Sequence, residues 1–331
     1  MPSFAVVAAT SWGVTLAALL ARNGHEVLLV ARDAREARAV NRARGLGRLP
    51  GLVLPDSVTA GVAADLPADC AGLVLAAPAQ ATRATLATLR VDRPPSVLSA
   101  AKGLETRTSL RMSEVIAERW PAARVAALSG PNLSREIVRG APAAAVIASA
   151  DASSAELWQR ALSGGAFRAY TSDDVVGVEL AGALKNVVAI AAGVATGLGF
   201  GANTVAAIMT RGLAEMTRLG MALGANPMTF QGLAGVGDLS ATCFSPLSRN
   251  RRLGEYLAHG LSPDAALARV GEVAEGAATA PVATALAARF AVEMPIAHHV
   301  AATLSGGETV PQAMAALLDR PFTSESGAAL R

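Results

Sequence analysis

An ammonium group stands inside a long apolar stretch of this sequence. The stretch runs from Val178 to Ile190, is long enough for several helical turns and contains Lys185. Of the 29 basic residues, two are lysines, Lys102 and Lys185, and the other 27 are arginines. A guanidinium stays protonated at any useful pH, whereas a buried ammonium can release its proton or act as a compact charge beside a substrate. The two lysines are therefore candidates for acid–base chemistry; the simpler interpretation is that compositional bias left two lysines by chance.

A polar stretch further along the chain contains possible partners for this lysine. Residues 235–242 place Asp238 directly after a glycine, and Arg249 and Asn250 follow shortly afterwards. We expect the glycines to let the backbone turn tightly around Asp238, so that its carboxylate orients Lys185 or a substrate hydroxyl. Arg249 and Asn250 carry donors that suit a phosphate or a carboxylate. The alternative is an ordinary capped helix start with solvated arginines.

The first half of the chain alternates apolar runs with helical patterns. The strands expected from these runs cover residues 4–8, 26–31, 72–77, 96–100, 124–128 and 143–149, with a last strand or turn near 167–171. This alternation predicts an α/β fold with a Rossmann-type, doubly wound, mostly parallel sheet. Ligands of such sheets bind beyond the carboxyl ends of the strands, where Lys102 and the turn at 129–132 are expected.

The turn after the first strand departs from the usual dinucleotide-binding pattern. In that G-x-G-x-x-G pattern the glycines make the turn, let the pyrophosphate approach the backbone and allow close packing. The corresponding residues here are Ala8, Thr10 and Gly13, so we expect weakened or shifted coenzyme binding, with a Thr10 Cβ where phosphate oxygens come close and a hydroxyl able to donate a hydrogen bond. Arg32, at the end of the second strand, favours a 2′-phosphate. The alternatives are a plain strand-to-helix turn and a solvated arginine.

The second half of the chain is dominated by helical patterns. They cover residues 175–194, 204–223, 252–259, 262–270 and 280–291. Ser172-Asp173-Asp174 provides capping residues for the helix expected at 175–194. We therefore expect a dinucleotide-binding domain at residues 1–172 and an all-α substrate and catalytic domain at 173–331, with a frayed tail from residue 323. Residues 186–210 lack charge over a membrane-spanning length, but glycines and Asn203 interrupt them, which favours helices of a water-soluble domain.

Composition narrows the classes of function. The chain has 331 residues, 52% apolar and 4% aromatic, and a net charge of +3 with scattered arginines, so nucleic acid is not an expected partner. Cys70 and Cys243 do not form a paired motif, and the four histidines have no metal-ligand spacing, so we expect neither disulfides nor a metal site. The N-terminus lacks the pattern of a secretory signal. A cytoplasmic enzyme fits these features best.

Several motifs in order resemble one enzyme family. Leu184-Lys185-Asn186, Gly235-Val236-Gly237-Asp238-Leu239, Ser248-Arg249-Asn250 and Val273-Ala274-Glu275-Gly276 are similar to motifs of the bacterial-type NAD(P)-dependent glycerol-3-phosphate dehydrogenases. The resemblance spans nearly the whole chain, from Ser11-Trp12-Gly13 through Lys102-Gly103 and Ser129-Gly130-Pro131 to Glu293-Met294-Pro295. The altered glycine turn is the one clear departure, and it bears on coenzyme affinity.

The resemblance implies roles for individual residues. It implies Lys185 as the acid–base group, with Asp238 beside it as the second catalytic residue. It implies a substrate site formed by Lys102, Gly130, Asn132, Lys185, Asn186, Asp238, Thr242, Ser248, Arg249 and Asn250. It implies coenzyme contacts from Ser11, Trp12, Gly13, Arg32, Lys102, Ser134, Arg249, Val273 and Glu275.

The implied reaction interconverts sn-glycerol 3-phosphate and dihydroxyacetone phosphate with NADP or NAD, NADP being favoured slightly by Arg32. It would supply glycerol 3-phosphate for phospholipid synthesis, and a homodimer is the usual form of the family. Two alternatives remain at this point. One is a catalytically impaired member that binds a phosphorylated metabolite without turnover, as the altered turn suggests. The other is a related reductase of another small hydroxy acid.

Overall fold

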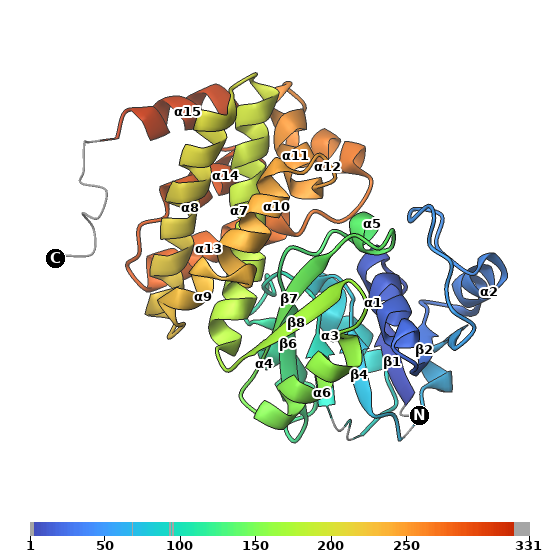
Figure 1. Ribbon diagram of the computed structural model, residues 1–331. Coiled ribbons are helices and arrows are strands. Elements are labelled where there is room, and N and C mark those ends of the chain that lie inside the picture. Colours follow the sequence, from blue (N-terminus) through green and yellow to red (C-terminus); the bar gives the residue numbers. More distant parts are fainter. Residues whose placement is uncertain (1–2, 68, 93, 95, 321–331) are drawn as a thin grey trace.

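An eight-stranded sheet organises the N-terminal half of the protein. The computed structural model describes residues 3–67, 69–92, 94 and 96–320 (Figure 1). The strands are β1 (Ser3–Val7), β2 (Glu26–Val30), β3 (Val58–Gly61), β4 (Gly72–Leu75), β5 (Ser96–Ser99), β6 (Arg124–Ser129), β7 (Ala143–Ser149) and β8 (Phe167–Ser172). Their order is β3-β2-β1-β4-β5-β6-β7-β8, and each neighbouring pair is parallel except β6 and β7. The predicted Rossmann-type sheet is confirmed.

Helices cover both faces of this sheet. They are α1 (Ser11–Arg22), α2 (Ala34–Ala43), the short η1 (Ala63–Asp65), α3 (Ala79–Thr88), α4 (Met112–Arg119), α5 (Ser134–Ile137) and α6 (Ala152–Leu162). Because both faces are covered, β4 and β5 are buried at every position, as is typical of parallel sheets. The chain leaves β1 toward β2 and later returns to β4 on the other side of β1. The strand order therefore reverses at β1 and β4, the place where such sheets bind ligands.

The one described strand that sequence analysis did not predict is β3. It has four residues at the edge of the sheet and alternates buried Val58 and Ala60 with the exposed Thr59. A run this short carries too little apolar periodicity to stand out from a loop. For the other strands, the observed ends differ from the predicted ends by at most two residues.

Helices make up the C-terminal half (Figure 1). They are α7 (Val175–Gly197), α8 (Ala202–Ala222), α9 (Pro227–Gln231), the π-helical turn η2 (Leu233–Gly237), α10 (Asp238–Phe244), α11 (Arg249–Ala258), α12 (Pro263–Val270), α13 (Glu275–Arg289), α14 (Pro295–Leu304) and α15 (Val310–Leu318). The expected all-α half is therefore confirmed. A division into separate domains at residue 172 stays a prediction, although the sheet ends at Ser172. The predicted frayed tail lies outside the described residues.

The central helix of this half is α7. Asp174 caps its first turn by accepting the N–H of Gly177 at 2.8 Å, and every residue from Gly177 to Ile190 is buried. Glycines allow α11 to approach its backbone: a Cβ on Gly193 would lie 2.0 Å from the carbonyl oxygen of Arg251. Among the described residues, α7 alone is long and apolar enough to cross a membrane, but 83% of its apolar window is buried inside the protein. It is therefore a core helix.

Three expectations about local structure were wrong. Asp238 does not lie in a tight glycine turn: η2 runs directly into α10, and Asp238 has helical φ and ψ of −72° and −33°. Gly235 serves close packing, because a Cβ there would lie 1.9 Å from the carbonyl oxygen of Phe230. The helix predicted at 252–259 begins earlier, since Ser248 caps α11 and places Arg249 and Asn250 in its first turn. Helix α13 likewise begins at Glu275, before the predicted residue 280.

Candidate active site

The side chain of Lys185 meets α10 in the interior. Its Nζ donates a hydrogen bond to Thr242 Oγ1 at 2.6 Å and lies 3.0 Å from Asp238 Oδ1. Asp238 and Thr242 are one helical turn apart on α10, so both face α7. The Lys185 side chain is 8% exposed and that of Asp238 is 3% exposed. An ammonium and a carboxylate thus face each other in a nearly dry environment.

Lys102 reaches the same carboxylate from the sheet. It follows β5, and its Nζ lies 2.7 Å from Asp238 Oδ2 and donates to the Gly130 carbonyl oxygen at 2.8 Å. Burial lowers the pKa of Lys102 to about 8, although the Asp238 carboxylate acts in the opposite direction. Burial by itself would raise the pKa of Asp238, but the two ammonium groups outweigh it and hold that pKa below its usual value. Asp238 is therefore an anionic bridge between two lysines.

Two asparagines connect this cluster to neighbouring helices. Asn186 donates to the carbonyl oxygen of Lys102 at 2.9 Å, and Asn250 donates to Asn186 Oδ1 at 2.8 Å. The Oδ1 atom of Asn250 accepts the N–H of Gly276 at 3.0 Å. Sequence analysis expected Asn250 to bind an anion, but in this geometry its amide is engaged with protein groups. It holds α7, α11 and α13 together around the turn that carries Lys102.

Arg249 is more accessible than these residues. Its side chain is 45% exposed, and its ion pair with Glu272 is long, at 3.9 Å. Ser248 is occupied as the cap of α11, because its Oγ accepts the N–H of Arg251. Asn132 donates to the carbonyl oxygen of Ala144, whereas its buried Oδ1 has no partner within the described part of the chain. Arg249 and Asn132 are thus two members of the predicted substrate set that have polar groups available for a ligand.

The altered glycine turn keeps the backbone shape of a dinucleotide-binding loop. Ala8 has a φ of +82°, in the region that favours glycine, and a Cβ on Gly13 would lie 2.2 Å from the Ala8 carbonyl oxygen. Thr10 caps α1 by accepting the N–H of Gly13 at 3.0 Å, while its hydroxyl donates to Ala76 O at 3.0 Å. The hydroxyl donates, as expected, but its acceptor is the protein carbonyl oxygen of Ala76, directly after β4.

Two buried polar atoms near this turn test whether a coenzyme fits. Trp12 Nε1 is buried without a hydrogen-bond partner in the described ranges. The Oε1 atom of Glu275 accepts the N–H of Ala79 at 2.9 Å. Its Oε2 atom, close to Gly103, is also buried and has no hydrogen-bond partner among the described residues. Burial raises the pKa of Glu275. A buried polar atom without a partner is costly, and a ligand with both amide and phosphate groups suits these positions.

The remaining predicted coenzyme residues lie around the carboxyl ends of the strands. Arg32 follows β2 with its side chain 82% exposed, and Ser134 begins α5. Val273, in the segment before α13, is 48% exposed. None of the three shares a hydrogen bond or ion pair with Lys185 or Asp238 among the described residues. The structure therefore contains a buried cluster around Asp238, whereas Arg32 and Val273 of the predicted coenzyme set are exposed.

This pairing of parts defines a class of protein. A doubly wound sheet with a dinucleotide turn, followed by a helical half that presents a buried lysine beside a carboxylate, is the architecture of an NAD(P)-dependent dehydrogenase. Sequence profiles identify the family: that for the "NAD-dependent glycerol-3-phosphate dehydrogenase N-terminus" matches residues 3–155, and that for the C-terminus of the same enzymes matches 174–315. The chain belongs to this family.

Individual relatives agree with this assignment. The chain is 48% identical to a glycerol-3-phosphate dehydrogenase [NAD(P)+] of Nocardia farcinica. The match covers 98% of this chain and 100% of that enzyme. It is 46% identical to the enzyme of that name from Halorhodospira halophila, over 98% of both chains. A crystal structure of glycerol-3-phosphate dehydrogenase from Coxiella burnetii superposes with a TM-score of 0.90 at 34% identity, covering 96% of this chain and 99% of the other. The resemblance inferred from the motifs is confirmed.

Proposed function

We propose that this protein interconverts sn-glycerol 3-phosphate and dihydroxyacetone phosphate by hydride transfer with NADP or NAD. The observation that carries this proposal is the contact of Lys185 with Asp238 and Thr242, next to the sheet edge that carries Lys102. The relatives bear the name of this activity, and they match this chain over nearly its whole length. The alternatives of a catalytically impaired member or another reductase are not favoured.

The reaction needs a hydride and a proton. When bound, NADP or NAD would supply the hydride for the carbonyl carbon of dihydroxyacetone phosphate, which places negative charge on the carbonyl oxygen. Lys185 donates its Nζ proton to that oxygen, and the hydroxyl of glycerol 3-phosphate forms. The resulting neutral amine regains a proton from solvent. Asp238 and Thr242 hold the Nζ atom in place, and the negative charge of Asp238 stabilises the protonated form before transfer.

We assign the other residues as follows. The substrate site comprises Lys102, Gly130, Asn132, Lys185, Asn186, Asp238, Thr242, Ser248, Arg249 and Asn250, with Lys185 and Asp238 as the catalytic pair. The half-exposed Arg249 suits the substrate phosphate, because the carboxylate with which it pairs, that of Glu272, is 3.9 Å away. The coenzyme site comprises Ser11, Trp12, Gly13, Arg32, Lys102, Ser134, Arg249, Val273 and Glu275.

The setting of the enzyme completes the proposal. The exposed Arg32 favours NADPH over NADH, because a guanidinium suits a 2′-phosphate. We infer a cytoplasmic homodimer that supplies glycerol 3-phosphate for phospholipid synthesis. The dimer is tested by light scattering of the purified protein.

The activity is tested by following coenzyme oxidation. Purified protein is mixed with NADPH or, separately, NADH, and the loss of coenzyme absorbance is recorded after dihydroxyacetone phosphate is added. Unphosphorylated dihydroxyacetone is the matched control for the phosphate requirement. We expect oxidation with the phosphorylated substrate only. A folded protein that oxidises neither coenzyme would support the catalytically impaired alternative, and equal rates with unphosphorylated keto compounds would support another reductase.

A further inference from the structure

An arginine that belongs to none of the sequence motifs covers the glycine turn. The Nη2 atom of Arg48 donates to the carbonyl oxygen of Ala9 at 2.8 Å, and its Nε donates to Ser11 Oγ at 3.2 Å. Ala9 and Ser11 lie on either side of Thr10, at the middle of the altered turn. Arg48 comes from the connection between α2 and β3 and is far away in sequence. No local pattern could have predicted its place.

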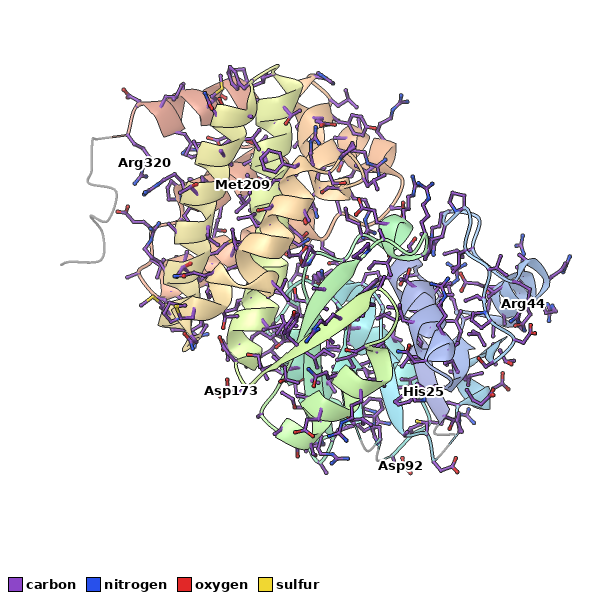
Figure 2. All side chains as sticks on the ribbon, viewed as in Figure 1. His25, Arg44, Asp92, Asp173, Met209 and Arg320 are labelled. Atoms are coloured by element: carbon purple, nitrogen blue, oxygen red, sulfur yellow. The ribbon has the colours of Figure 1, made fainter. Side chains whose placement is uncertain are left out.

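The connection that carries Arg48 is held firmly against the sheet. Arg44, which ends α2, donates to the carbonyl oxygens of Leu54 and Val58, both at 3.0 Å, and lies at the outer edge of this half in Figure 2. The residue after Arg48 is Leu49, which is 2% exposed in the hydrophobic core. With Leu49 anchored in the core, Arg48 is kept at the rim of the turn.

Arg48 has no carboxylate partner among the residues that the structure describes. Its contacts in the described structure are the two hydrogen bonds to the turn. Ser11 is the first residue of the 12-residue helix α1, whose N-terminus also favours negative charge. A guanidinium has five N–H donors in a planar fork, so two bonds to the turn leave donors for a phosphate.

We propose that Arg48 is a coenzyme-binding residue that contacts the pyrophosphate of NADP or NAD. It offsets the loss of two glycines from the turn. In the usual turn, glycine lets the pyrophosphate approach backbone N–H groups. Here Thr10 brings a Cβ to that place and its Oγ1 accepts the N–H of Gly13, so the turn has fewer free donors for phosphate oxygens. A guanidinium fixed beside Ser11 provides charge-assisted donors at the same place.

This inference rests on the coenzyme class of the proposed function and is independent of the substrate. Its main rival is that Arg48 only ties the connection to the turn. In that case its removal would lower stability and leave coenzyme affinity unchanged. A second rival is that Arg48 covers the turn and hinders the coenzyme, so that its removal would tighten binding. Direct measurement of coenzyme affinity separates all three.

The test compares Arg48→Gln with Arg22→Gln. Arg22 is an exposed arginine at the opposite end of α1, so its replacement removes the same charge away from the turn. Dissociation constants for NADPH and NADH are measured by calorimetry without substrate. We expect Arg48→Gln to raise the dissociation constants of both coenzymes about tenfold or more, as for the loss of a charged hydrogen bond. Arg22→Gln should change neither dissociation constant by more than about twofold. Unchanged or tighter binding would overturn the proposal, and so would a loss confined to NADPH, which would place Arg48 at the 2′-phosphate.

Restoring the glycines tests the compensation. In the Ala8→Gly/Thr10→Gly background, the backbone can again approach the pyrophosphate, so Arg48→Gln should cost clearly less affinity than in the natural turn. An equal loss in both backgrounds would contradict a compensating role. Turnover of dihydroxyacetone phosphate is measured separately: a protein that binds both coenzymes through Arg48 but turns over no substrate would refute the proposed function and leave this inference intact.

Discussion

Asp238 Oδ2 lies 2.7 Å from Lys102 Nζ, while the other oxygen of the same carboxylate lies 3.0 Å from Lys185 Nζ. The only two lysines in the sequence therefore meet on one acid, one arriving from the sheet and one from α7. A single buried carboxylate between two ammonium groups leaves the cluster with excess positive charge. That excess suits an anionic substrate and an oxygen that becomes negative during reduction.

Replacing Lys185 by arginine separates acid–base chemistry from charge. The guanidinium keeps the positive charge but does not release a proton at a useful pH. We expect Lys185→Arg to lower kcat by about 100-fold or more, the usual contribution of a general acid, with the circular dichroism spectrum unchanged. The measurement is coenzyme oxidation with dihydroxyacetone phosphate. Near-normal turnover in this variant would show that Lys185 is not the proton donor.

Deprotonation of Lys102 should lower the activity at basic pH. Because burial lowers its pKa to about 8, Lys102 is charged below that pH and loses its proton above it. We expect kcat/KM for dihydroxyacetone phosphate to fall as pH rises through about 8, since the anionic substrate loses a cationic partner. Lys102→Arg remains charged and should lose this inflection, at whatever rate it retains. The same inflection in wild type and variant would assign the titration to another group.

Glu179 should position α7 against the sheet. Its buried carboxylate accepts the N–H of Ser113 at 2.8 Å and pairs with Arg111 at 3.0 Å, at the beginning of α4. Removing it leaves the buried N–H of Ser113 without its acceptor, whereas Arg111 keeps Glu114 as a partner at 2.8 Å, so Glu179→Ala should lower the free energy of unfolding by about 1–3 kcal/mol. Because Lys185 lies further along α7, kcat should also fall, with KM affected less.

The matched control is an exposed ion pair on α6, in the N-terminal half that also carries Arg111. Glu156 and Arg160 are one turn apart on α6, and their side chains are 55% and 80% exposed. Glu156→Ala should leave stability and kcat unchanged within error, because exposed pairs are screened by solvent. Urea unfolding and initial rates measure both variants. Equal behaviour of the two would mean that Glu179 does not position α7.

Glu215 should make stability depend on pH. Burial raises its pKa to about 7, even though the carboxylate accepts the N–H groups of Ile296 and Ala297 at the start of α14. Because this pKa exceeds the value of 4.5 expected in the unfolded chain, the native state binds more protons than the unfolded state between pH 4.5 and about 7. The contribution of Glu215 to the free energy of unfolding therefore falls as pH rises through this range. Glu215→Gln lacks this titration. Its melting temperature relative to wild type should therefore rise from about pH 5 to about pH 8; a constant difference would contradict the raised pKa.

Local patterns in the sequence predicted much of the fold. Continuous apolar runs are typical of strands buried on both faces, and seven of the eight described strands had this signal. The short edge strand β3 did not. The helical half was also predicted in outline, but the starts of α11 and α13 were not. Helix α11 begins where Ser248 caps it, and the start of α13 packs Gly276 against Asn186 of α7. Packing of this kind joins residues far apart in the sequence, so a pattern in neighbouring residues does not predict it.

By itself, the sequence determined which residues have unusual chemistry: two lysines among arginines, an acid after a glycine, and a turn that lacks two glycines. Side-chain chemistry belongs to each residue and needs no fold to be recognised. Only the tertiary structure decided which of these groups meet. It brought both lysines to Asp238, engaged Thr10 with Ala76, and placed Arg48 over the turn. Such contacts join distant segments, and their distances follow from how the sheet, α7 and α10 pack together.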